Sequence, residues 1–111
     1  MSTKGILINY QYCTGCMSCE VACKKEHDLP KGKFGIKLAD LGPWQIEGKK
    51  WEWDHIPMPS DFCNLCEHRT SKGEEPSCVL HCLGGCIEVG DVDDLAKIAK
   101  ENGRKTVLFV P

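Results

Sequence analysis

The chain has 111 residues, a length typical of a single domain. Its 14 lysine and arginine residues nearly balance its 16 aspartate and glutamate residues, so the composition gives no electrostatic support for binding nucleic acid or an anionic membrane. Nine cysteines, by contrast, are far more than the packing of a small core requires.

The first half of the chain predicts a strand, a helix and a β-rich segment. Residues 5–10 (GILINY) predict a strand that leads into the first cysteines. Residues 18–28 predict a helix that stops before Pro30. The cysteine-free stretch that follows, up to residue 62, is rich in glycine, proline and tryptophan, and it predicts short strands with hairpin turns at 32–33 and 48–50.

The last 26 residues predict a strand at 86–90, a helix at 91–103 and a strand at 106–110. Asp91 is suited to the N-cap of the helix and Gly103 to its end. Apolar residues at helical spacing form one stripe along it, consisting of Leu95, Ile98 and Ala99. We expect this part of the chain to be a packing element.

Four cysteines between residues 13 and 23 have the spacing C-x2-C-x2-C-x3-C: Cys13, Cys16, Cys19 and Cys23. A 4Fe–4S cluster takes four thiolates, and the first three cysteines of such a run can surround one cluster. Small or polar residues between them allow backbone N–H groups to approach the cluster sulfurs. Cys23 lies one helical turn beyond Cys19 and is predicted to bind a second cluster.

A second group, with the spacing C-x2-C-x11-C-x3-C, supplies the missing ligands. We predict that one 4Fe–4S cluster is bound by Cys13, Cys16, Cys19 and Cys82. The other is predicted to be bound by Cys63, Cys66, Cys78 and Cys23. The long gap of this group, residues 67–77, predicts a surface loop.

Disulfides and zinc are the alternative uses of these thiols. An odd cysteine count without a secretion signal argues against disulfides. A zinc site usually takes two pairs of ligands, whereas the first group alone offers four thiols. Binding of iron–sulfur clusters is therefore the favoured prediction.

Several residues are open to two interpretations. Cys86 is predicted to be a packed residue at the start of a strand, and the alternative is a ligand that replaces Cys82. Trp44, Trp51 and Trp53 are predicted to cover a small core, and the alternative is docking of a partner. Four scattered histidines are expected to lie outside the ligand sets: His27, His55, His68 and His81. The sequence contains no catalytic triad, phosphate loop or haem motif.

The segments YCTGCMSCEVACKKEH (12–27) and CNLCEHRTSKGEEPSCVLHC (63–82) resemble the first and last cysteine motifs of a known family. It comprises the iron–sulfur electron-transfer subunits of molybdopterin oxidoreductases of the dimethyl sulfoxide reductase family. Larger members have two further cysteine motifs between these, whereas this chain has none. The family also usually has proline at the position of Leu83 and a small residue at that of Cys86.

The resemblance implies a single ferredoxin-like α+β dicluster domain over residues 1–111. Its cysteine motifs are 13–23 and 63–82, with a β-rich insertion at 24–62 and a C-terminal helix–strand extension at 91–111. It implies one-electron transfer as a non-catalytic small subunit of a larger molybdopterin or tungstopterin oxidoreductase, together with a further electron donor or acceptor. A free, diffusible dicluster ferredoxin is the main alternative, and a redox sensor or structural cluster module is another.

The segment MSTKGILINY lacks the apolar run of a signal peptide, and no segment reaches the roughly 18–20 apolar residues of a membrane span. We therefore expect a cytoplasmic chain without direct membrane insertion. Export to the periplasm together with a partner is the alternative.

Overall fold

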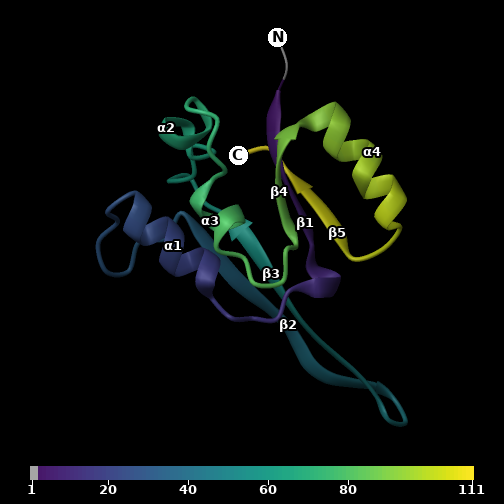
Figure 1. The fold of residues 1–111 in the computed structure, drawn as a ribbon. Coiled ribbons are helices and arrows are strands. Elements are labelled where there is room, and N and C mark those ends of the chain that lie inside the picture. The colour runs from purple at the N-terminus through teal and green to yellow at the C-terminus, as the bar shows by residue number, and fades with distance from the viewer. Residues whose placement is uncertain (1–2) are drawn as a thin grey trace.

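A three-stranded antiparallel sheet forms the centre of the computed structural model, which describes residues 3–111 (Figure 1). Its strand order is β4 (Ile87–Asp91), β1 (Lys4–Asn9) and β5 (Thr106–Phe109). These are the three strands predicted at the two ends of the chain. The predicted α+β class is confirmed.

The central strand β1 is buried on both faces because a layer of structure covers each side of the sheet. Ile6 and Ile8 pack with cysteines on one face, whereas Leu7 and Ile98 line a cavity on the other. Helix α4 (Val92–Asn102) covers this second face and packs against all three strands (Figure 1). The sequence of β1 is therefore a continuous apolar run, as expected for a strand without a solvent-facing side.

Helix α4 has the predicted boundaries within one residue. Gly103 ends it with a φ of 80°, a conformation that glycine adopts without steric cost. Asp91 occupies the N-cap as predicted, but its side chain makes no capping hydrogen bond. The helix is held mainly through Leu95, which is buried against the sheet.

Helix α1 and the two short helices α2 and α3 lie on the opposite face of the sheet. Helix α1 (Ser18–Glu26) ends two residues earlier than predicted, after which the His27 N–H donates to the Cys23 carbonyl. The predicted surface loop contains α2 (Glu67–Thr70) and is exposed over residues 71–75, whereas Pro76 and Ser77 at its end are buried. Helix α3 (Ser77–Leu80) begins at its last residue. A short 3₁₀ turn, η1 (Tyr10–Tyr12), connects β1 to the first cysteines.

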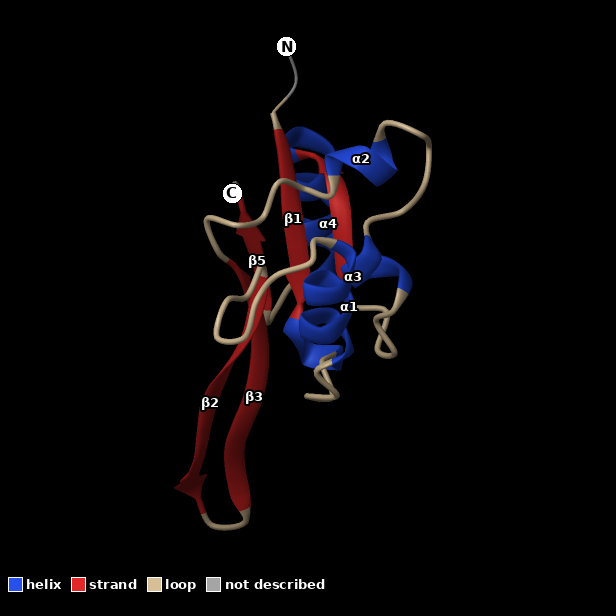
Figure 2. Ribbon diagram, turned by 90° about the vertical axis from the view of Figure 1, so that its left-hand side faces the viewer, coloured by secondary structure: helices blue, strands red, loops and turns tan. Residues whose placement is uncertain are grey.

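The middle of the chain forms one long hairpin instead of several short strands. Strands β2 (Ile36–Glu47) and β3 (Lys50–Pro59) pair along their length and are joined by the predicted turn near residue 48. A turn also exists at 30–33, but it is not a hairpin turn because no strand precedes it. Figure 2 shows the outer half of the hairpin projecting beyond the rest of the molecule.

The inner half of this hairpin is attached to the body of the fold. Lys105 Nζ lies 3.1 Å from both carboxylate oxygens of Asp54 on β3. In addition, the buried Glu20 of α1 accepts a hydrogen bond of 2.6 Å from the Leu38 N–H on β2, and Lys37 lies 3.6 Å from the same carboxylate. The hairpin base is therefore fixed to both the sheet and α1.

The three tryptophans lie on the projecting part of the hairpin, and the prediction that they cover a core is wrong. Trp44, Trp51 and Trp53 are 50%, 61% and 60% exposed. A projecting two-stranded ribbon has no second layer against which such residues can pack.

Within residues 3–111, no helix is both long and apolar enough to cross a membrane.

Candidate metal centres

The first cysteine cavity lies between the first cysteine loop, the start of α1 and the turn that precedes β4. Its lining includes five cysteine side chains: Cys13, Cys16, Cys19, Cys82 and Cys86. Apolar side chains of the hairpin and of β4 complete the wall, namely Leu38, Pro57 and Ile87. Four of the five cysteines are those predicted to bind one cluster.

The second cysteine cavity lies next to it, against the other end of α1. The cysteines that line it are Cys23, Cys63, Cys66 and Cys78, the four predicted to bind the other cluster. Ile6, Ile36 and Val89 provide apolar walls. The fold thus gathers the eight predicted ligands into two groups, each with three cysteines from one sequence motif and one from the other.

The two C-x2-C loops share an unusual backbone conformation. The residue before the second cysteine is left-handed in both loops, with φ of 75° at Gly15 and 61° at Leu65. In this conformation the N–H of Gly15 hydrogen-bonds the sulfur of Cys13, and the N–H of Leu65 does the same for Cys63. A non-glycine residue with positive φ is uncommon, and such strain concentrates at functional sites.

Further backbone N–H groups are directed at the sulfurs. Those of Gly35 and Ile36 hydrogen-bond Cys23, and that of Glu20 hydrogen-bonds Cys19. A Cβ atom at position 35 would overlap the sulfur of Cys23, so only glycine allows the backbone to approach so closely. Such donors stabilise negative charge on sulfur.

Burial sets the direction in which the pKa values of several thiols shift. Burial raises the pKa of Cys19 and Cys78 to about 12 and that of Cys23 to about 11, with neighbouring cysteines adding to the effect. Cys16 is the exposed cysteine among the nine, all of which lie in the described part of the chain. Hydrogen bonds from Ser18 lower the pKa of Cys16 to about 7.

The hairpin base contributes to both cavities, which the sequence did not reveal. It supplies Leu38 and Pro57 to the first cavity and the Gly35–Ile36 backbone to the second. His55 of β3 also packs over the first cysteine loop, where a Cβ atom at Gly15 would lie 2.8 Å from its ring. No spacing rule connects a histidine 40 residues away to a cysteine loop.

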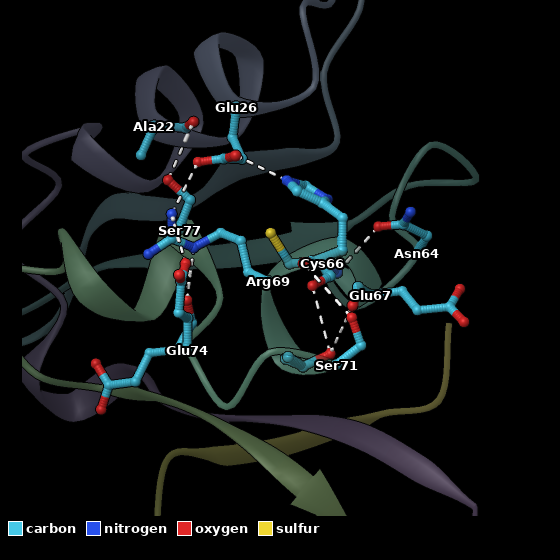
Figure 3. A network of polar contacts seen from close by, with 12 residues as sticks. Ala22, Glu26, Asn64, Cys66, Glu67, Arg69, Ser71, Glu74 and Ser77 are labelled. Carbon is cyan, nitrogen blue, oxygen red and sulfur yellow. Dashed lines mark hydrogen bonds and ion pairs between the residues drawn. The ribbon is translucent and has the colours of Figure 1, made fainter.

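A network of polar contacts fixes α2 and the loop after it against α1 (Figure 3). Glu26 is its centre: one carboxylate oxygen lies 2.7 Å from His68 Nε2, and the other accepts a hydrogen bond of 3.3 Å from Arg69. Arg69 also contacts Glu74 at 3.5 Å. Ser77 Oγ donates to the Ala22 carbonyl at 3.3 Å and joins α3 to α1. These contacts position Cys66 and Cys78 from outside the second cavity.

Of the histidines, His27 lines the second cavity beside its cysteines. Ligand atoms of His27, Cys66 and His68 lie within 4.8 Å of one another, but His68 is engaged by Glu26 and Cys66 is shared with the second cavity. Burial and the nearby His68 lower the pKa of His27. His81 Nδ1 lies 2.9 Å from the Ser77 carbonyl.

Cys86 is buried as predicted, but its surroundings are not those of an ordinary packed residue. It directly precedes β4, and its sulfur lies 3.7 Å from that of Cys82 on the wall of the first cavity. Burial and the charge of Cys82 raise the pKa of Cys86 well above its usual range. Cys86 therefore lines the first cavity together with the four predicted ligands.

The donor chemistry of both cavities fits a thiolate-bound metal centre. Each cavity combines four or five sulfur donors with apolar walls and inward-directed N–H groups. Sulfur-only sets of this kind select iron–sulfur clusters or zinc over magnesium or calcium, which require oxygen. Fold and site together define a small α+β metal-binding protein with two thiol-lined cavities.

Comparison with known proteins finds similarity to subunits of reductases. It is 32% identical over 96 residues to the putative dimethyl sulfoxide reductase iron–sulfur subunit of Halobacterium salinarum, covering 84% of this chain and 33% of that protein. It is 29% identical over 105 residues to a chain of the polysulfide reductase of Wolinella succinogenes, covering 93% and 43%. A subunit of the tetrathionate reductase of Salmonella typhimurium is 26% identical, covering 80% and 58%.

The chain is therefore related over most of its length to one group of reductase subunits, an iron–sulfur subunit of dimethyl sulfoxide reductase among them, which confirms the resemblance drawn from its cysteine motifs. It spans between 33% and 58% of the length of the three relatives described above. No family model matches the chain.

Proposed function

We propose that the chain binds two 4Fe–4S clusters and transfers single electrons as the small subunit of a larger oxidoreductase. The first cluster takes Cys13, Cys16, Cys19 and Cys82, and the second takes Cys23, Cys63, Cys66 and Cys78. The observation that supports this most is the crosswise grouping of the thiols around two adjoining cavities. On this proposal, residues 1–111 form one ferredoxin-like dicluster domain with an insertion at 24–62 and an extension at 91–111.

When bound, such clusters supply one-electron redox chemistry, and the protein tunes it through hydrogen bonds, charge and burial. The N–H groups of Gly15, Gly35 and Leu65 point at ligand sulfurs and favour the more negative, reduced state. The apolar walls have the opposite effect because burial disfavours added negative charge. The chain therefore sets the potentials through the balance of these two influences.

The two cavities adjoin at α1, which supports electron transfer between them within the chain. Cys19 belongs to the first cavity and Cys23 to the second, yet they are one turn apart on α1. Cys19 also raises the pKa of Cys78 by its charge, although the two line different cavities. This proximity supports a relay of two steps through the subunit.

We place the exchange of electrons with an outside redox partner at Cys16. This exposed cysteine borders an open groove between α1 and the turn after α3. Met17, Val21 and Leu83 line the same groove and are largely exposed, Leu83 by 79%. An apolar, accessible rim beside a ligand is a suitable contact surface for a redox partner, because it brings the partner's cofactor close to the cluster.

The projecting hairpin supports a stable partner instead of free diffusion. Trp51 and Trp53 share one face of the ribbon, whereas Trp44 pairs with Glu52 and therefore lies on the other. Large aromatic residues exposed on both faces are best covered by a groove in another protein, and aromatic residues are enriched in interfaces. We propose that this arm docks into the larger catalytic subunit.

The partner is proposed to be a molybdopterin or tungstopterin oxidoreductase, since the relatives are named as subunits or chains of reductases. A further donor or acceptor protein completes the electron path. The compartment is proposed to be the cytoplasm, with co-export to the periplasm as the alternative. The competing function is a freely diffusing dicluster ferredoxin, which requires no aromatic arm.

Anaerobic purification from the native source tests the proposal. We expect the chain to co-elute at fixed stoichiometry with a large pterin-containing protein. The variant Trp51→Ser/Trp53→Ser should lose this association and keep its iron, whereas the matched exposed variant Val110→Ser should keep both. Isolation of the unaltered chain alone, as a monomer, would show that it is not a stable subunit.

A further inference from the structure

We propose that the first cysteine cavity carries a reserve ligand: the sulfur of Cys86 can replace that of Cys82 as the fourth ligand of the first cluster. The inference rests on the proposed function, since it requires that a cluster occupies this cavity. It develops the alternative interpretation of Cys86, for which the structure now supplies three observations.

The first observation is the number of thiols. Five cysteines line the first cavity, whereas four line the second. A 4Fe–4S cube takes four thiolates, so one of the five is always uncoordinated. Cys86 is 4% exposed, and its sulfur contacts Cys82 at 3.7 Å and hydrogen-bonds with Cys13. It therefore lies among the ligands and not behind them.

The second observation is the backbone that places it there. The N–H of Gly85 donates to the carbonyl of Cys82 at 3.3 Å and closes a tight turn, in which Gly85 has a φ of 61°. A Cβ atom at Gly84 would lie 2.5 Å from the Tyr12 carbonyl, so this turn packs directly on the segment that enters the first loop. The two glycines thus return the chain so that positions 82 and 86 face the same space.

The third observation is the difference in burial between the two cysteines. The carbonyl of Cys86 accepts a hydrogen bond of 2.9 Å from the Asn9 N–H, which ties it to β1 in the core. Cys82 is only half-buried and is followed by the exposed Leu83. Cys82 is thus the ligand position nearer to solvent, whereas the thiol of Cys86 is held beside the cavity and is available when that of Cys82 is lost.

Replacing each cysteine by alanine under anaerobic conditions tests the inference. Iron per molecule and the electron paramagnetic resonance spectrum of the reduced protein are measured after reconstitution. We expect about eight irons in the unaltered protein and in Cys82→Ala and Cys86→Ala, and about four in the double variant. The matched control is Cys78→Ala, which should fall to about four because the second cavity has no fifth cysteine.

The spectrum gives a readout that iron content alone does not. In Cys82→Ala the spectrum of the reduced protein should shift, because one ligand of the first cluster now comes from a different position, whereas in Cys86→Ala it should stay that of the unaltered protein. A fall to about four irons in Cys82→Ala, or in Cys86→Ala alone, would overturn the inference by showing that one position is indispensable. Should Cys82→Ala not fold, Cys82→Val, which also lacks a donor atom, is judged by the same criteria. Fewer than about eight irons in the unaltered protein would instead refute the proposed function.

Discussion

Replacing Gly15 by alanine should weaken the first cysteine loop by more than backbone strain alone. Gly15 has a φ of 75°, a conformation that costs an L-residue about 1–2 kcal/mol. A Cβ atom there would also lie 2.8 Å from the ring of His55, and such overpacking typically costs a further 1–3 kcal/mol. His55 is held by Asp40 at 2.7 Å, so the ring cannot move away freely.

Gly32→Ala is the matched control because Gly32 has a φ of 84° and no atom within 4 Å of its added Cβ. It carries the strain without the clash. The two variants should therefore differ by about 1–3 kcal/mol, which corresponds to about 5- to 150-fold in a rate or equilibrium constant.

The assay is the anaerobic loss of visible cluster absorbance in guanidinium chloride. The first loop must open before a cluster can leave, so the strain appears in the rate of loss. Gly15→Ala should lose absorbance faster than Gly32→Ala, and adding His55→Ala to Gly15→Ala should remove most of the difference. Equal rates for both glycine variants, or no rescue by His55→Ala, would refute the contact between hairpin and loop.

Two further predictions concern α1 and the exposed cysteine. Glu20→Ala should lower the free energy of unfolding by about 1.5–3 kcal/mol, because it leaves the Leu38 N–H without its acceptor. Glu20→Gln keeps an acceptor oxygen and should cost roughly half as much. Equal losses for the two variants in anaerobic denaturant titrations would contradict this. In protein stripped of metal, Cys16 should react first with iodoacetamide at neutral pH, and Ser18→Ala should slow it, as followed by peptide mass spectrometry. Earlier labelling of Cys63 or Cys86 would contradict the order of their pKa values.

Much of the candidate site could be predicted because its information is local. The spacing between Cys13 and Cys23 fixes which thiols can share a loop and which one must turn away along α1. The strand, helix and strand at the C-terminal end were also predictable, since Asp91 and Gly103 mark the helix boundaries. That β5 pairs with β1 at the far end of the chain could not be foreseen from local pattern.

What the sequence did not reveal depends on contacts between distant segments. The glycine, proline and tryptophan content of this stretch predicts a set of short strands, yet the two strands of the hairpin continue past a shift in register between Leu41 and Trp44. Its base then supplies His55 to the first cysteine loop. Likewise, the sequence predicts Cys86 at the start of a strand, but the glycine turn that returns its sulfur to within 3.7 Å of Cys82 depends on the fold.

The most direct test of two crosswise thiol-bound clusters is the content of iron and acid-labile sulfide in anaerobically purified protein. The account predicts about eight of each per molecule, with a spectrum of two interacting clusters after reduction because the cavities adjoin. A colourless protein that contains about two zinc ions and no labile sulfide would contradict it.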